Sequence, residues 1–130
     1  LAKQLAATLA MRAEYRGPLR KKDAATAREL FDAYEQGDAV AREVLAQAVA
    51  YWGMAAANLV SLFNPEKIIF GGGVFGPAIE LIPAIRQEAE KWAQPISIKQ
   101  VSFEPSALAG DAGVYGAGFL AMKHISQQGK

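Results

Sequence analysis

The chain has 130 residues, with 14 Lys and Arg against 13 Asp and Glu, one histidine and no cysteine. The lack of cysteine excludes a disulfide scaffold, a thiolate nucleophile and every cysteine-based zinc site, and a single His124 excludes a multi-histidine metal site. A net charge of +1 gives no broad attraction for nucleic acid or an anionic membrane, so we predict neither partner. The composition favours a soluble, cytoplasmic, Ala-rich α/β protein.

The first third of the chain is predicted to be helical with one irregular break. Apolar residues at helical spacing predict a helix from Leu1 to about Met11, ended by Arg16-Gly17-Pro18. Arg20-Lys21-Lys22 is a short basic loop, for which a solvated connector is favoured over a contact with phosphate. A second helix is predicted from Asp23 to Gln36, with Gly37 as its C-terminal stop. The first helix has no N-cap, which suggests that it continues a longer protein.

The middle of the chain predicts one long helix. Asp38 is placed to cap it, and Asn64-Pro65 ends it after Phe63. Its second half, Tyr51 to Phe63, has no charged residue, which is typical of a helix buried on all sides. We interpret the stretch from Val44 to Pro65 as a buried helix rather than a membrane span, because it is rich in Ala and lacks flanking anchors. Such a helix needs a partner surface that the rest of the chain does not offer.

A strand–helix–strand unit follows. The β-branched run Lys67 to Phe70 predicts a strand of a parallel sheet covered on both faces. A helix is predicted from Val74 to about Ala93, with Pro83 either restarting or kinking it. Alternation of apolar and polar residues predicts a half-buried strand from Ile96 to Phe103.

A last helix is predicted to begin at Asp111. Its Gly113, Gly116 and Gly118 would permit close approach of a neighbour. N-capping is the simpler role for Asp111, although its carboxylate could also lie near a ligand. The other carboxylates are scattered, and no two of them stand out as an acid–base pair.

Gly71, Gly72 and Gly73, here called the glycine turn, form the most informative candidate site together with Val74. Three residues without a Cβ, between a strand and a helix, let the backbone lie against a planar or anionic ligand. The carboxyl end of a parallel strand is also where open α/β sheets bind ligands. A simple tight turn is the alternative on spacing alone. The segment matches neither the dinucleotide-binding G-x-G-x-x-G pattern nor a Walker A loop.

Three stretches together resemble a known family. Residues 57–74 read A-N-L-V-S-L-F-N-P-E-K-I-I-F-G-G-G-V, and this stretch resembles A-N-L-x-x-x-x-N-P, a strand and G-G-G-V of the ROK family of bacterial sugar kinases and sugar-responsive repressors. Residues 83–86, P-A-I-R, resemble its P-x-I-R stretch, and residues 108–117, L-A-G-D-A-G-V-Y-G-A, resemble its L-G-x-D-A-G-x-x-G-A stretch. The resemblance covers about residues 23–123, with a truncated helix and linker at 1–22 and a polar tail at 124–130.

The resemblance implies an α/β fold that is the C-terminal part of an actin-like, hexokinase-like (ribonuclease H-like) ATPase domain, with long helices packed on a short parallel sheet. Gly71, Gly72 and Gly73 would match its adenosine-binding turn, with Val74 beside the base. The implied cofactor is ATP, with Mg²⁺ in the full-length parent. A structural zinc in the parent would have no ligands in this chain. No catalytic residue is predicted here, since the family's base, phosphate loop and sugar contacts would lie in a missing N-terminal lobe.

Three functions remain open. The favoured one is a part of an ATP-dependent sugar kinase, transferring phosphate to the 6-hydroxyl of a hexose or N-acetylhexosamine and inactive alone. The second is a part of a sugar-responsive transcriptional repressor of the same family. The third is a stand-alone helical dimerisation module, which the uncharged segment from Tyr51 to Phe63 would support. The expected partners are the N-terminal lobe, a sugar in the parent, and a second copy of the chain.

Overall fold

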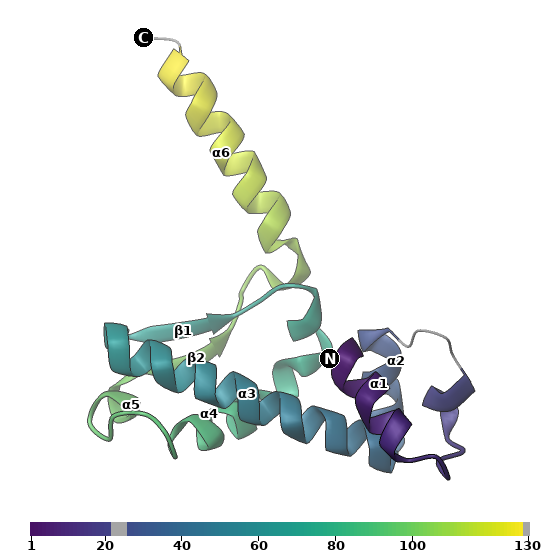
Figure 1. The fold of residues 1–130 in the computed structure, drawn as a ribbon. Helices are drawn as coiled ribbons and strands as arrows, with labels where there is room; N and C mark the ends of the chain where they lie inside the picture. The colour runs from purple at the N-terminus through teal and green to yellow at the C-terminus, as the bar shows by residue number, and fades with distance from the viewer. Residues whose placement is uncertain (22–25, 129–130) are drawn as a thin grey trace.

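The computed structural model describes residues 1–21 and 26–128. The elements up to β2 form one body, and α6 projects away from it toward the C-terminus (Figure 1). The elements in chain order are α1 (Ala2–Met11), a 3₁₀ turn (Pro18–Lys21), α2 (Ala27–Glu35), α3 (Ala39–Phe63), β1 (Lys67–Phe70), 3₁₀ turns (Gly73–Phe75 and Pro77–Leu81), α4 (Ile82–Ala89), α5 (Ser97–Gln100), β2 (Ser102–Pro105), a 3₁₀ turn (Ala109–Asp111) and α6 (Ala112–Gln128).

Local hydrogen bonds fix both ends of α2. The Thr26 hydroxyl accepts from the Glu29 N–H, and the Glu29 carboxylate accepts from the Thr26 N–H, which is a reciprocal capping box. The helix therefore begins at Ala27, and the predicted start at Asp23 lies outside the described residues. Gly37 follows the helix with φ of 82°, so the prediction of a glycine stop is confirmed.

The prediction for α3 is confirmed at both ends. Oδ1 of Asp38 accepts from the N–H groups of Val40 and Ala41, each at 2.9 Å, and Asn64 ends the helix in the left-handed conformation with φ of 45°. Although α3 is long and apolar enough to cross a membrane, one of its faces packs against α1, α2, α4 and α5, as in the core of a folded domain. Its buried residues are Val40, Ala41, Val44, Leu45, Ala48, Gly53, Ala56, Ala57 and Val60.

Within this chain α3 is not buried on all sides, in agreement with the expectation that the rest of the chain offers too little partner surface. Tyr51, Leu62 and Phe63 are 62%, 75% and 71% exposed. The reason is that α1, α2, α4 and α5 pack on the other side of the helix. The uncharged half of α3 therefore offers an apolar surface to the solvent in this structure.

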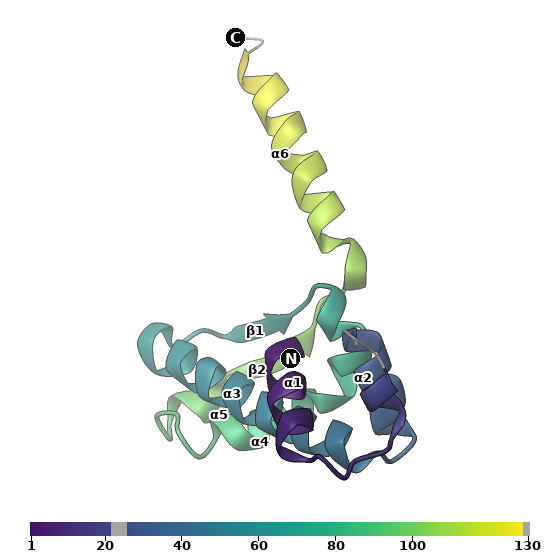
Figure 2. The ribbon, with the colours of Figure 1, turned by 45° about the vertical axis from the view of Figure 1, so that its right-hand side comes forward.

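The two strands pair in parallel, with Lys67 opposite Ser102 and Phe70 opposite Pro105. Ile68 packs with Phe103 on a cluster that α3, α4 and α5 contribute, so long helices lie on a short parallel sheet as predicted. Coverage of both faces is not seen, because Ile69 on the other face is 64% exposed. Figure 2 shows that α3, α4 and α5 all lie on one side of the two strands.

The strand predicted from Ile96 to Phe103 is wrong in its first half. Residues 97–100 form the short helix α5, and the strand β2 begins only at Ser102. The cause is a side-chain cap, since Oε1 of Gln94 accepts from the N–H groups of Ile96 and Ser97 at 2.8 and 2.7 Å. Alternating apolar residues are thus held in a helical turn by a local hydrogen bond that periodicity does not reveal.

The single helix predicted from Val74 to Ala93 is also wrong, because two 3₁₀ turns precede α4 and α4 ends at Ala89. Pro77 starts the second 3₁₀ turn. Pro83 is the second residue of α4, where a missing N–H costs no intrahelical hydrogen bond. Of the two roles left open for Pro83, restarting the helix is therefore the one observed.

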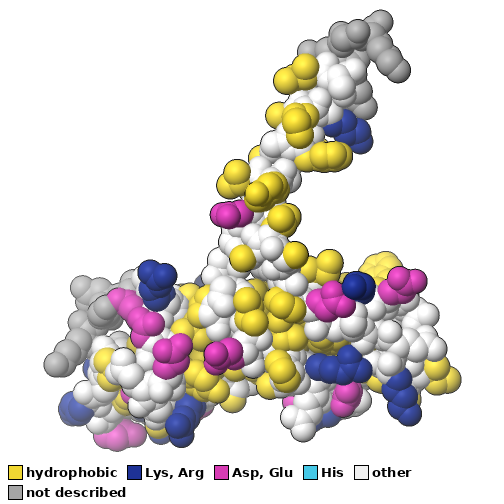
Figure 3. Space-filling view, turned by 180° about the vertical axis from the view of Figure 1, so that it is seen from behind, with side chains coloured by type: hydrophobic (Ala, Val, Ile, Leu, Met, Phe, Trp, Pro, Cys, Tyr) yellow, Lys and Arg dark blue, Asp and Glu magenta, His cyan; other side chains and the backbone are white. Residues whose placement is uncertain are grey.

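The last helix starts directly after Asp111, which lies in the preceding 3₁₀ turn. Most of the side chains of α6 are exposed, and Figure 3 shows hydrophobic groups along it that continue over the body below. A Cβ placed at Gly113, Gly116 or Gly118 would meet no atom within 4 Å. The close approach that these glycines permit is therefore not made by any described residue of this chain.

Candidate functional site

The glycine turn leaves β1 in a conformation that favours glycine. Gly72 has φ of 87° and ψ of 174°, which L-residues with a side chain rarely adopt. Its carbonyl accepts from the N–H of Phe75 at 3.0 Å, which closes the 3₁₀ turn that follows. A Cβ at Gly72 or Gly73 would point into open space. The backbone of the turn is therefore directly accessible to a ligand.

A cavity of about 610 Å³ opens beside the glycine turn, between the starts of α1 and α2 and the middle of α3. This volume lies within the range of roughly 300–1,000 Å³ that small-molecule sites occupy. The four predicted site residues all line it, so the structure brings them together, while their role in binding stays a prediction. The lining residues are Leu1, Ala2, Thr26, Ala27, Trp52, Gly71, Gly72, Gly73, Val74 and Phe75.

Two aromatic residues at this cavity were missed by sequence reasoning. The rings of Trp52 and Phe75 have centroids 5.2 Å apart, and Phe75 packs on Phe70 at 5.0 Å. Trp52 packs on the core and also lines the cavity. The position of Trp52 at the cavity could not be predicted from residue spacing, because it depends on the tertiary packing of α3.

The loop before α6 lies against the glycine turn. The N–H of Ser106 donates to the carbonyl of Phe70 at 2.7 Å, and a Cβ at Gly71 would lie 3.1 Å from Cβ of Ser106. Gly71 therefore permits this close approach. The structure thus places the 71–74 and 108–111 stretches next to each other, with Asp111 exposed at the edge.

Arg86, from the P-x-I-R stretch, lines neither this cavity nor the second one below. Its guanidinium donates to the carbonyls of Val101 at 2.7 Å and Ile98 at 2.9 Å, and its Cζ lies 5.6 Å from the centroid of the Phe103 ring. It also pairs with Glu90 at 3.2 Å. These contacts join α4 to α5 and β2, so Arg86 holds the second strand in place.

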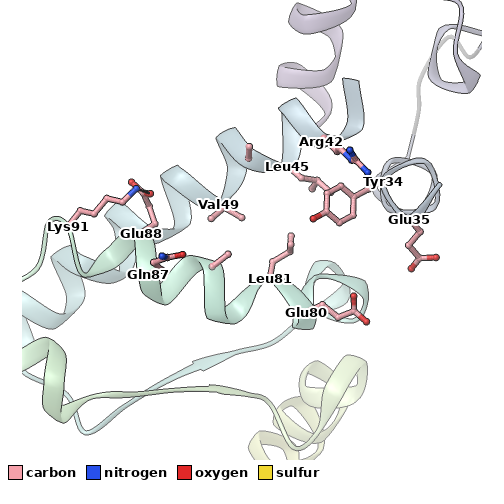
Figure 4. Close-up of a pocket in the computed structure, with 12 residues that line it drawn as sticks. Tyr34, Glu35, Arg42, Leu45, Val49, Glu80, Leu81, Gln87, Glu88 and Lys91 are labelled. Atoms are coloured by element: carbon pink, nitrogen blue, oxygen red, sulfur yellow. Dashed lines mark hydrogen bonds and ion pairs between the residues drawn. The ribbon is translucent and has the colours of Figure 1, made fainter. Parts of the chain in front are cut away.

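A second cavity of about 810 Å³ lies between α2, α3 and α4 and shares no lining residue with the first (Figure 4). Charges of both signs surround it, including Arg42, Glu80 and Lys91. Glu88 pairs with Lys91 and accepts from the Trp92 indole N–H, and these hydrogen bonds lower the pKa of its carboxyl. Within residues 1–21 and 26–128, no group of three or more His, Cys, Asp or Glu is placed to hold a metal ion.

Comparison with known proteins identifies the family. A sequence profile of the ROK family matches residues 2–124. The chain belongs to the ROK family. It is 37% identical over 105 residues to a glucokinase from Halalkalibacterium halodurans, a match that covers 81% of this chain and 32% of the glucokinase. It is 28% identical over 95 residues to the DNA-binding transcriptional repressor Mlc of Escherichia coli, covering 73% of this chain and 23% of Mlc.

Solved structures show the same fold. A crystal structure of a protein described as a sugar kinase, from Cytophaga hutchinsonii, aligns with a TM-score of 0.75 over 92% of this chain and 40% of that one, at 24% identity. This chain is therefore an α/β part of the fold that the sugar kinase structure has, with helices on a short parallel sheet, as predicted. It spans about a third of the length of the glucokinases that it matches.

Proposed function

We propose that this chain is the C-terminal part of an ATP-dependent sugar kinase of the ROK family and supplies the adenosine side of its site. The observation that carries the proposal is the glycine turn, in which three consecutive glycines line a cavity of about 610 Å³. The identity of 37% to a glucokinase supports a hexose or N-acetylhexosamine as the sugar. As part of the same proposal, the parent is a cytoplasmic homo-oligomer.

The residues of the site fit a nucleoside. Open space at Gly72 and Gly73 lets a ribose or a base approach the main chain, and a side chain there would protrude into the cavity. Phosphoryl transfer depends on positioning and on electrostatic stabilisation of the transferred group. In the proposed kinase, the catalytic base and the groups that hold Mg²⁺ belong to the N-terminal lobe. We therefore expect this chain alone to phosphorylate no sugar.

A sugar-responsive repressor is the second candidate function. The observation that favours it is the match of 28% identity to Mlc, which covers 73% of this chain. In a repressor, the same fold would carry an added DNA-binding segment and a weakened nucleotide site. The kinase is favoured because the backbone of the glycine turn is open rather than filled by side chains.

The test uses the full-length parent protein in a coupled assay of ATP consumption with glucose, N-acetylglucosamine and N-acetylmannosamine. Gly72→Ala adds a Cβ inside the cavity at φ of 87°. The matched control is Gly37→Ala, which has nearly the same backbone strain at φ of 82° but lies between α2 and α3. We expect Gly72→Ala to raise the KM for ATP at least severalfold, and Gly37→Ala to leave it unchanged.

The outcomes separate the candidates. Sugar-dependent ATP consumption that weakens only in Gly72→Ala supports the kinase. A parent that consumes no ATP with any sugar, but releases its operator DNA when sugar is added, supports the repressor. Equal effects of Gly72→Ala and Gly37→Ala on KM would mean that the glycine turn acts on stability alone.

A further inference from the structure

Trp52 occupies a defined position at the edge of the proposed adenosine site. It extends from α3 into the wall of the cavity that the glycine turn also lines. Its ring packs on Phe75 at 5.2 Å, Phe75 packs on Phe70 at 5.0 Å, and Phe70 packs on Phe103 at 5.5 Å. This row of rings connects α3 to both strands, so the indole is held in place before any ligand arrives.

The indole is also accessible, because Trp52 is only partly buried while it contacts the core. Gly72 and Gly73 line the same cavity and have no side chain and no atom within 4 Å of their Cβ positions. The cavity is therefore lined by an aromatic ring and by bare backbone. A flat aromatic ligand is the chemical class that matches such a pair of surfaces, since every nucleobase has a π-face that stacks on aromatic side chains.

We infer that Trp52 is a base-binding residue of this site and that the adenine ring of ATP lies against its indole. The inference rests on the proposed function and adds a specific residue to it. Phosphate groups gain nothing from an indole, so Trp52 favours ligands that carry a base. Phe75 contacts the indole, and Phe75 itself packs on Phe70. Because the indole is held by this packing, it loses little side-chain entropy when a nucleotide binds.

A purely structural role for Trp52 makes a different prediction. If Trp52 only filled the core, its replacement would lower stability but would not change the preference for ATP over a ligand without a base. The informative quantity is therefore the ratio of the dissociation constants for ATP and for inorganic tripolyphosphate. This ratio is independent of a uniform loss of folded protein.

The experiment uses the full-length parent and titrates ATP, adenosine and tripolyphosphate by calorimetry and by tryptophan fluorescence. Trp52→Leu keeps an apolar helix-forming residue, and Trp52→Phe keeps an aromatic face. The control is Trp92→Leu, because Trp92 is 60% exposed and lines neither cavity. We expect Trp52→Leu to weaken ATP and adenosine binding about tenfold and tripolyphosphate binding hardly at all. Trp52→Phe should recover most of the loss, and Trp92→Leu should behave as wild type.

Fluorescence gives an independent readout if Trp52→Leu fails to fold. Adenosine should quench the emission of wild type and Trp92→Leu, and the quench should be absent in Trp52→Phe. ATP binding with no quench and with equal affinity in all variants would overturn the inference while leaving the proposed function intact. No ATP binding by the wild-type parent would overturn both.

Discussion

The phenol of Tyr15 donates a hydrogen bond of 2.7 Å to Oδ2 of Asp38, while Oδ1 of the same carboxylate caps α3. Tyr15 belongs to the loop after α1, and Asp38 stands at the turn between α2 and α3. One carboxylate therefore joins an N-terminal loop to the start of the core helix. The N–H of Leu19 also donates to the Tyr15 oxygen at 3.4 Å, which holds the following 3₁₀ turn near the same point.

This contact predicts a pH dependence of stability. Burial and then the hydrogen bond to Asp38 raise the pKa of Tyr15 to about 12. An unfolded tyrosine titrates near pH 10, so the stabilisation is complete below pH 10 and is lost as the pH rises toward 12. Below pH 10 we expect Tyr15→Phe to unfold at a lower urea concentration than wild type. Above pH 10 the difference between the two urea midpoints should narrow. A difference that stays constant with pH would contradict a stabilising role of the protonated Tyr15 hydroxyl.

Gly53 permits a close approach of α3 and α4. A Cβ at this position would lie 2.6 Å from both Cβ and Cγ of Glu88 and 3.1 Å from the backbone nitrogen of Ala89. Alanine improves helix propensity by about 1 kcal/mol, whereas overpacking costs about 1–3 kcal/mol. We therefore expect Gly53→Ala to destabilise the chain by up to about 2 kcal/mol in a denaturant titration.

The control for Gly53→Ala is Gly116→Ala, since Gly116 is also inside a helix but a Cβ there meets no atom within 4 Å. It should unfold at the wild-type midpoint or slightly above it. If both variants behaved alike, the contact between Gly53 and Glu88 would not limit the approach of the two helices.

The sequence predicts those parts of the fold that depend on neighbouring residues. Asp38 and Pro65 mark the ends of α3 because capping and the absence of an N–H act locally. The glycine turn is visible for the same reason, as three residues without Cβ follow a β-branched strand. The wall of the cavity was not predictable, since Trp52 and the glycine turn come to the same cavity only through tertiary packing. The strand prediction at residues 96–100 was wrong because the Gln94 side chain caps a helical turn there, which the alternation of apolar and polar residues does not reveal.

Arg86 is expected to resist conservative replacement. It donates through two nitrogens to the carbonyls of Ile98 and Val101 and lies over the Phe103 ring. A lysine ammonium cannot reproduce this planar, two-point geometry, and one carbonyl would lose its charged donor. We expect Arg86→Lys to cost about 1–3 kcal/mol of unfolding free energy. Arg28→Lys, an exposed change on α2, should cost nothing measurable by the same titration. Equal stability of the two variants would show that the two carbonyl contacts contribute little.

Ala109 is the position where a local sequence change should stabilise the protein. It has φ of 44° in the 3₁₀ turn that leads into α6, and it stands where the resembling L-G-x-D stretch has glycine. A left-handed L-residue costs roughly 1–2 kcal/mol, while a glycine loses about 0.4–1 kcal/mol through the greater entropy of the unfolded chain. Relief of strain is the larger effect, so Ala109→Gly should gain about 0.5–1 kcal/mol.

The comparison for Ala109→Gly is Asn64→Gly, because Asn64 has nearly the same φ, 45°, at the end of α3. Asparagine tolerates the left-handed region much better than alanine, so this change should leave the unfolding free energy unchanged or slightly lower. Thermal unfolding of the full-length parent measures both changes, because the turn at Ala109 contacts the 3₁₀ turn Gly73–Phe75 in the body of the domain. If Ala109→Gly gives no gain over Asn64→Gly, the left-handed conformation of Ala109 costs less free energy than this argument assumes.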